Sequence, residues 1–226
     1  MLQSGAQGFC FPKDALSFLS DLKANNSKEW FAENKPRFES SVQAPSKVFV
    51  EIMLPMLEGL AGHVLTAKIF RIHRDLRFSK DKTPYKPYQH FLFAPVGRGK
   101  SGPALFFALE PEKLFVGAGM FDFSREELDR FRRLVLCEEG TALAQILRAQ
   151  INDGRRLREP SLKKVPRGFD ANHERADLLR HKGLSVWQDI DDPHLATRPD
   201  FIELLEQQFT ALLPVYRWLS DHVVDT

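Results

Sequence analysis

The chain has 226 residues, with 32 Lys and Arg against 30 Asp and Glu, and 43% of its residues are hydrophobic. This composition is typical of a globular protein with a sizeable core, and it excludes a disordered or strongly charged chain. Its 2 cysteines are too few for a disulfide framework.

The longest apolar stretch, residues 48–67, is broken by Glu51, Pro55 and Glu58. A membrane-spanning helix rarely tolerates such residues. The first 18 residues lack the basic and then apolar pattern of a secretory signal. We therefore expect a protein of the cytoplasm with no membrane partner.

The amino-terminal part of the chain is expected to be helical. Apolar residues recur at helical spacing over residues 12–26, and Ser27 is placed to cap a second helix. Pro36 and Pro45 are expected to interrupt the helical pattern, because proline has no N–H to donate. A third helix is expected over residues 46–60.

The middle of the chain, residues 66–122, is expected to form a sheet. Short runs rich in Phe and Val are separated by Gly, Pro and charged residues, and they lie at residues 67–72, 89–96, 103–111 and 113–121. Their connections are short, so the strands are expected to be mostly antiparallel.

Residues 123–226 are expected to mix helices with irregular chain. Ser124 followed by two glutamates predicts the start of a helix that continues through Leu134. The remaining predicted elements are a helix at 140–151, a short helix at 176–179, a strand at 183–187 and an amphipathic helix at 199–222 with a kink at Pro214.

These elements together predict the fold class. With helices over residues 12–62, we expect a single α+β domain that spans residues 1–226. Its centre is a mostly antiparallel sheet of about four to six strands, around which the amino-terminal and carboxy-terminal helices pack.

Positive charge is concentrated in one place, the basic segment, which we define as residues 68–86. It holds seven Lys and Arg against two Asp, whereas the rest of the chain has 25 basic and 28 acidic residues. Such an excess is repulsive unless an anion, an acidic neighbour or solvent offsets it. Arg71, Arg74, Arg77 and Lys80 recur every three residues, which would place them side by side on a helix.

Two familiar motifs are not matched. Residues 94–101 resemble a phosphate-binding P-loop, but Ala94 replaces its first glycine and a strand-like run follows it instead of a helix. A glycine-rich hairpin turn is therefore expected there. The histidines form neither an HExxH motif nor a tight cluster with cysteine, so no metal site is expected.

Residues 74–86, RDLRFSKDKTPYK, resemble the signature of the family called domain of unknown function 2461. Residues 18–39, 109–121 and 165–182 are similar to the same family's pattern in the same order, so the resemblance covers nearly the whole chain. Glu174 departs from it, at a position where the pattern has proline. The resemblance implies a single α+β domain and no established activity, cofactor or catalytic residue.

We expect the basic segment, chiefly residues 71–86, to bind a phosphate-bearing or other anionic ligand. A second charged motif, residues 166–170 (PRGFD), is followed by His173 and Lys182, and we expect it to fold against the basic segment to complete one pocket. The predicted ligand-binding residues are Arg71, Arg74, Arg77, Lys80, Lys82, Tyr85, Lys86, Arg167 and Lys182.

Two other functions stay open. A phosphoester-directed enzyme would draw its acid–base groups from Asp75, Asp81, Asp170 and His173. Alternatively, the chain is a protein-interaction module whose basic segment is a structural network of salt bridges. A small phosphate-bearing molecule is the expected partner, with nucleic acid less favoured because the whole chain is nearly neutral. The sequence leaves open the ligand, any catalysis, any cofactor and the oligomeric state.

Overall fold

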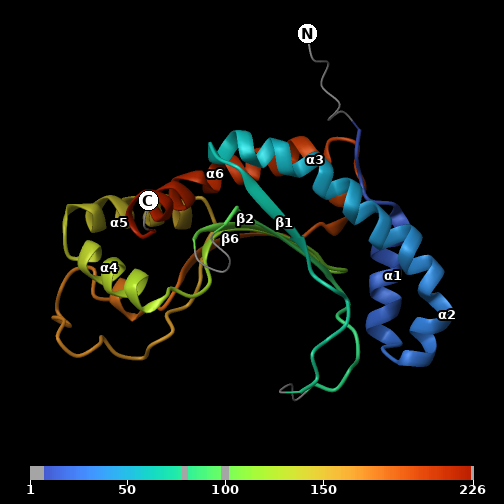
Figure 1. Cartoon of the computed structure of the whole chain (residues 1–226), viewed down its shortest axis with the longest axis horizontal. Coiled ribbons are helices and arrows are strands. Elements are labelled where there is room, and N and C mark those ends of the chain that lie inside the picture. The colour runs from blue at the N-terminus through green and yellow to red at the C-terminus, as the bar shows by residue number, and fades with distance from the viewer. Residues whose placement is uncertain (1–7, 78–80, 98–101, 225–226) are drawn as a thin grey trace, which may run out of the picture.

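The structure is a computed structural model that describes residues 8–77, 81–97 and 102–224. Within these residues it contains an antiparallel sheet of six strands in the order β1-β2-β3-β4-β6-β5 (Figure 1). The strands are β1 (Leu65–Ile69), β2 (Gln89–Pro95), β3 (Ala104–Leu109), β4 (Leu114–Met120), β5 (Arg156–Leu157) and β6 (Leu184–Ile190). The α+β class and the antiparallel sheet are therefore as predicted.

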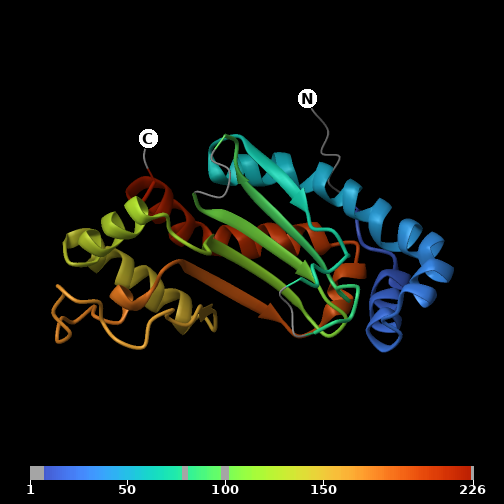
Figure 2. The same cartoon turned by 60° about the horizontal axis from the view of Figure 1, so that its bottom comes forward.

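Two long helices, α3 (Ala44–Ala61) and α6 (Phe201–His222), lie along one face of the sheet. Figure 2 shows the opposite face turned toward the viewer, and no helix of the described residues crosses in front of it. We call this second side the open face. The helices at the two ends of the sheet flank it without covering it.

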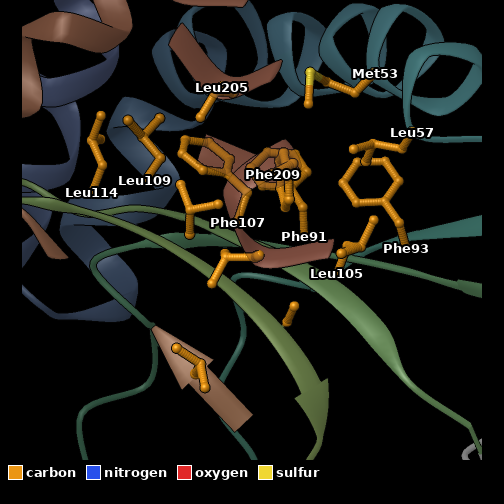
Figure 3. Packing of buried hydrophobic residues seen from close by; sticks show 14 of the residues in the cluster. Met53, Leu57, Phe91, Phe93, Leu105, Phe107, Leu109, Leu114, Leu205 and Phe209 are labelled. Atoms are coloured by element: carbon orange, nitrogen blue, oxygen red, sulfur yellow. The ribbon is translucent and has the colours of Figure 1, made fainter. Parts of the chain in front are cut away.

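The hydrophobic core fills the space between the covered face and the two long helices (Figure 3). Phe91 and Phe107 are register partners on β2 and β3, and they lie beside Met53 of α3 and Phe209 of α6. All four side chains are almost completely buried. Burying each of them contributes about 1.5–3 kcal/mol. Because side chains alternate along a strand, the residues between them point to the open face.

The first two predicted helices are confirmed as α1 (Lys13–Ala24) and α2 (Lys28–Phe38). The hydroxyl of Ser27 caps α2 as expected, because it accepts a hydrogen bond from the backbone N–H of Trp30 at 3.2 Å. A side chain that satisfies one of these free N–H groups stabilises a helix by about 1 kcal/mol.

The predicted interruption between the second and third helices is wrong. Helix α2 passes directly into α3 through a π-helical turn, η1 (Glu39–Gln43). Ala44 donates its N–H to the carbonyl of Glu39, five residues back, instead of the usual four. The next residue is Pro45, which has no N–H to donate, so the wider turn lets the helix continue past it.

The carboxy-terminal elements follow the prediction with changes in length. Three helices appear as α4 (Arg125–Val135), α5 (Glu138–Asn152) and α6, which continues through Pro214. The short helix expected near residue 176 is instead a 3₁₀ turn, η2 (Leu178–Arg180). Strand β5 and the 3₁₀ turn η3 (Pro193–Thr197) were not predicted, because such short elements carry no readable periodicity.

A helix that crosses a membrane must be both long and strongly apolar, and none of the helices in the described residues is both.

Candidate functional site

The basic segment leaves the sheet at the end of β1 and returns to it at the start of β2. His73 and Tyr85 form an isolated β-bridge, and Arg74 donates its N–H to the carbonyl of Pro84 at 2.8 Å. The two arms thus pair as an irregular hairpin, so the predicted helical grouping of the arginines is wrong. Proline favours an extended residue before it, which suits paired arms better than a helix. Lys80 lies outside the described residues.

Tyr85 anchors the basic segment to helix α2 and the turn before it. Its ring stacks on Phe31 with centroids 4.1 Å apart, and its side chain is buried. The side chain of Asn26 binds the backbone of Tyr85 twice, accepting from its N–H at 3.0 Å and donating to its carbonyl at 2.9 Å. The ring of Tyr85 therefore belongs to the core and holds the returning arm in place.

Several predicted ligand-binding cations are engaged inside the segment itself. Arg74 forms an ion pair with Asp81 at 2.9 Å, and Arg77 forms one with Asp75 at 2.7 Å. Hydrogen bonding from Arg77 holds the pKa of Asp75 far below its usual range. Both carboxylates are exposed and ionised, so they offset positive charge and are poorly suited to proton transfer near neutral pH.

Lys82 is also engaged in the loop, since its ammonium donates to the carbonyl of Leu76 at 3.0 Å. Hydrogen bonds from the backbone and hydroxyl of Thr83 lower the pKa of Asp81. These contacts match the alternative in which part of the basic segment is a structural network. They fix the tip of the hairpin by bonds within the segment.

Three cations at the base of the hairpin form a different group, which we call the cationic cluster: Lys68, Arg71 and Lys86. Within the described part of the chain, no ion pair joins any of them to a carboxylate. The ammonium groups of Lys68 and Lys86 lie 4.9 and 6.0 Å from the ring centroid of Phe70. Burial lowers the pKa of Lys86, and so do the neighbouring charges of Arg71, Arg74 and Lys68. The charge of Arg71 also helps to lower the pKa of Asp75, which is paired with Arg77, so the positive charge here is only partly offset.

A cleft of about 500 Å³ lies on the open face beside the cationic cluster, and we call it the aromatic cleft. Phe70 forms part of its wall, so the cleft and the cluster share a side chain. Most of its lining is apolar, and the polar groups that reach it come from His90, Glu110 and Arg156. An apolar cavity with a few polar groups is the usual form of a ligand site.

The floor of the aromatic cleft is built from three rings. Phe106 and Trp187 lie 5.3 Å apart with planes tilted by 30°, and Phe121 packs against the edge of Phe106 at 4.5 Å. The indole N–H of Trp187 donates to the hydroxyl of Ser185 at 2.9 Å, which fixes its orientation. Trp187 crosses the backbone of Gly117, where any side chain would collide with the ring. The absence of a side chain at Gly117 therefore lets the indole of Trp187 lie directly against the backbone of β4.

His90 and Glu110 place an acid–base pair at the rim of this cleft. The Nε2 atom of His90 lies 3.1 Å from a carboxylate oxygen of Glu110, and the imidazole stacks on Tyr88 with centroids 4.1 Å apart. A carboxylate that holds one nitrogen of an imidazole leaves the other free to exchange a proton. Sequence reasoning missed this pair, because the two residues meet only through the register of β2 and β3.

The PRGFD motif does not meet the basic segment, so the expected single pocket is not formed. The motif belongs to the loop that enters β6 at Leu184, which pairs with Met120. The basic segment adjoins the opposite end of the sheet, where Leu114 pairs with Ile190. Figure 1 shows the two loops well apart below the sheet. Arg167 and Lys182 are exposed on the distant loop.

The PRGFD loop instead packs on helices α4 and α5. The ring of Phe169 lies 5.8 Å from the guanidinium of Arg132, and Arg175 donates to the carbonyl of Val135 at 2.7 Å. Asp170 accepts from the N–H of Asn172 at 2.8 Å, as a turn-forming aspartate does.

The four predicted acid–base candidates therefore do not converge. Asp170 and His173 lie on the distant loop, where His173 accepts from the backbone N–H of Arg175 at 3.1 Å. Asp75 and Asp81 lie in the hairpin tip with arginine partners. Nor do the described residues bring together three or more His, Cys, Asp or Glu side chains in a geometry that would hold a metal ion.

One comparison with known proteins gives a match. The sequence model of the family described as "Conserved hypothetical protein (DUF2461)" matches residues 14–218. This span includes the basic segment, all six strands and most of α6. No curated protein matches the chain.

Proposed function

Because the chain belongs to the DUF2461 family of conserved hypothetical proteins, whose description assigns no activity, we propose a function from the site alone. In this proposal the protein binds a phosphate-bearing ligand that also carries a flat ring. The phosphate contacts the cationic cluster, and the ring enters the aromatic cleft. A nucleotide has this chemistry.

The positive charge beside the aromatic cleft, which no ion pair within the described residues offsets, is the observation that carries the proposal. Lys68, Arg71 and Lys86 lack carboxylate partners among the described residues, and Lys86 is half-buried. Keeping such cations together costs free energy in the absence of an anion. A phosphate placed among them would form charge-assisted hydrogen bonds and would raise the lowered pKa of Lys86.

The floor of the cleft supports the second half of the proposal. Phe121 is 45% exposed and Trp187 is half-buried, and both rings pack on Phe106, which is itself buried. Stacking a nucleobase on such a ring is worth about 1–3 kcal/mol. The proposal narrows the predicted site, which ran over residues 71–86 with Arg167 and Lys182, to the base of the basic segment and adds Lys68.

A phosphoester-directed enzyme is the second candidate, and only the contact between His90 and Glu110 favours it. In this reaction His90 takes the proton of a water molecule as the water oxygen attacks phosphorus, and Glu110 holds the imidazole in position. The bond from phosphorus to the ester oxygen breaks, and the imidazolium of His90 or solvent returns a proton to the departing oxygen. The cationic cluster would stabilise the negative charge that develops on the phosphoryl oxygens.

Calorimetric titration of uridine and adenosine monophosphate at low salt tests the binding proposal. Lys86→Gln is expected to weaken binding roughly 10-fold, which corresponds to about 1.4 kcal/mol for one charged hydrogen bond. Lys28→Gln is the matched control, because Lys28 is exposed on α2, away from the cleft. If Lys86→Gln and Lys28→Gln bind equally well, the cationic cluster is not the phosphate site.

Inorganic phosphate and uridine separate the two halves of the ligand. Both should bind more weakly than the monophosphate, because each fills only one part of the site. Hydrolysis of a chromogenic phosphoester that falls far more in His90→Gln than the affinity for the monophosphate does would support the second candidate. Absence of turnover with the wild type would remove it and leave the binding proposal intact.

A further inference from the structure

The register of the sheet aligns one row of residues across all six strands on the open face. Each pair of neighbours in the row is a direct partner in the ladder, so the side chains point to the same side. The row runs through Lys68, Leu92, Phe106, Gly117, Trp187 and Arg156. It therefore has a cation at each end and apolar or aromatic groups between them.

The length of this row decides what kind of ligand fits it. Neighbouring strands lie about 4.8 Å apart, so five steps separate the backbones of Lys68 and Arg156 by about 24 Å. One phosphate group cannot contact both ends, even with the long reach of these side chains. A ligand that uses both ends must be extended and must carry negative charge at more than one point.

The opposite edge of the sheet, at β5, also places cations beside an aromatic ring, as the cationic cluster does. The guanidinium of Arg158 lies 5.6 Å from the ring centroid of Phe121 and donates to the backbone carbonyl of that residue. Arg156 is paired with Asp189 at 2.9 Å, and Lys113 approaches the same carboxylate at 3.5 Å, so this group keeps a positive balance.

Two acidic groups also border the open face, and they do not remove this balance. Glu110 is held by His90 at 3.1 Å, while Asp122 lines a neighbouring hollow that shares Phe106 and Phe121 with the aromatic cleft. The two hollows adjoin on the open face, since Phe70 also lines both of them, and we call them together the channel.

We propose that this channel binds a single-stranded nucleic acid that crosses the strands. The backbone phosphates contact the cationic cluster at one edge and Arg156 and Arg158 at the other, and unpaired bases stack on the rings between them. This inference rests on the proposed function, because the mononucleotide site is one end of the channel. A sheet with exposed rings and a positively charged border is a known platform for unpaired bases.

Charge and shape favour a single strand over other occupants of this face. Duplex bases are already stacked on each other, so they cannot lie on Trp187 or Phe121. An acidic peptide would satisfy the cations at the two edges but offers no array of flat rings for the floor. The nearly neutral whole chain is no obstacle, because the positive charge is placed at the edges of one face.

Fluorescence anisotropy with a labelled uridine octamer, measured over a series of salt concentrations, tests the inference. Arg156→Gln should weaken octamer binding at least 5-fold and reduce the slope of log K against log salt by about 0.7. It should weaken octamer binding more than uridine monophosphate binding, because only the octamer carries a phosphate at that edge. Arg148→Gln, an exposed arginine on α5, is the matched control. The Arg156 side chain is itself 53% exposed, so its removal leaves the fold intact.

Trp187→Leu keeps an apolar side chain but removes the ring, and it should weaken octamer binding roughly 5- to 150-fold. Quenching of Trp187 fluorescence by the octamer, absent from the Trp187→Leu protein, would show direct stacking. Equal competition by duplex RNA or by an octaglutamate peptide would overturn the inference, because neither requires the rings.

The outcomes separate this inference from the function on which it rests. If the monophosphate binds in a Lys86-dependent way but the octamer binds no more tightly, the ligand is a mononucleotide and the channel is not used. If neither ligand binds at low salt, both proposals fail. Octamer binding that is insensitive to both Arg156→Gln and Trp187→Leu also overturns the inference.

Discussion

Substitution of Gly117 by alanine should disturb the floor of the aromatic cleft with little effect on the backbone. A Cβ atom at this position would lie 2.6 Å from Cε3 of Trp187 and 2.8 Å from Cζ3. Carbon atoms normally approach no closer than about 3.5 Å, so the rigid indole must shift by about 1 Å. The backbone at Gly117 has no positive φ, so the collision is the main cost.

The size of the effect follows from three contributions. Overpacking of this kind costs about 1–3 kcal/mol. Displacing Trp187 also breaks its hydrogen bond to Ser185, which is worth about 0.5–1.5 kcal/mol. Alanine lowers the conformational entropy of the unfolded chain relative to glycine, which stabilises the folded protein by about 0.4–1 kcal/mol. The expected net loss in the free energy of unfolding is therefore about 1–3 kcal/mol.

Urea unfolding followed by far-ultraviolet circular dichroism measures this loss without relying on tryptophan fluorescence. The same substitution is then made in a Trp187→Ala protein, where the indole is gone. There Gly117→Ala should be neutral or slightly stabilising. Equal destabilisation in the two backgrounds would refute the reasoning, because the collision would not be with the ring.

Three other predictions follow from polar contacts. Lys86→Gln should raise stability at pH 7 by about 0.5–1 kcal/mol while weakening nucleotide binding. Burial and neighbouring cations lower the pKa of Lys86 in the folded protein, so the unfolded chain binds the lysine proton more tightly. The stability gained by Lys86→Gln should therefore shrink as the pH rises toward the ordinary pKa of lysine, because the folded wild type then loses the repelling charge. Asp14→Asn should cost about 0.5–1 kcal/mol at pH 7. Hydrogen bonds from Arg37 lower the pKa of Asp14, so this cost is present above the ordinary carboxyl pKa and disappears as the pH falls through the lowered value. Asn26→Ala should cost about 1–3 kcal/mol and speed hydrogen exchange at the N–H of Tyr85.

Each of these has a measurement that can contradict it. For Lys86, the urea midpoints of Lys86→Gln and the wild type are compared from pH 7 to 10. Equal midpoints over this range would show that Lys86 is not repelled by its neighbouring cations. For Asp14, a stability difference that persists at pH 2 would assign the effect to packing. For Asn26, the PRGFD loop is the distant reference. If Asn26→Ala leaves hydrogen exchange at the N–H of Tyr85 as slow as in the wild type, as it does in that loop, the side chain of Asn26 does not anchor the basic segment.

Much of the fold could be predicted because local chemistry determines it. The apolar spacing of α1 and α6 and the caps at Ser27 and Ser124 require only neighbours along the chain. The Phe-rich strands were found for the same reason, since short connections leave antiparallel pairing as the simple solution. The π-helical turn before Pro45 was missed, because helices that absorb an extra residue leave no clear sequence signal.

For the site, the sequence by itself determined that positive charge gathers between the first two strands. Only the tertiary structure decided which of these cations are available. Arg74 and Arg77 find carboxylates within the hairpin, whereas Lys68 and Lys86 lie beside Phe70 and, like Arg71, form no ion pair among the described residues. The acid–base pair, the aromatic floor and the row across the sheet all depend on register. A register brings together residues far apart in the chain, and the pattern of a single strand contains no information about its partner.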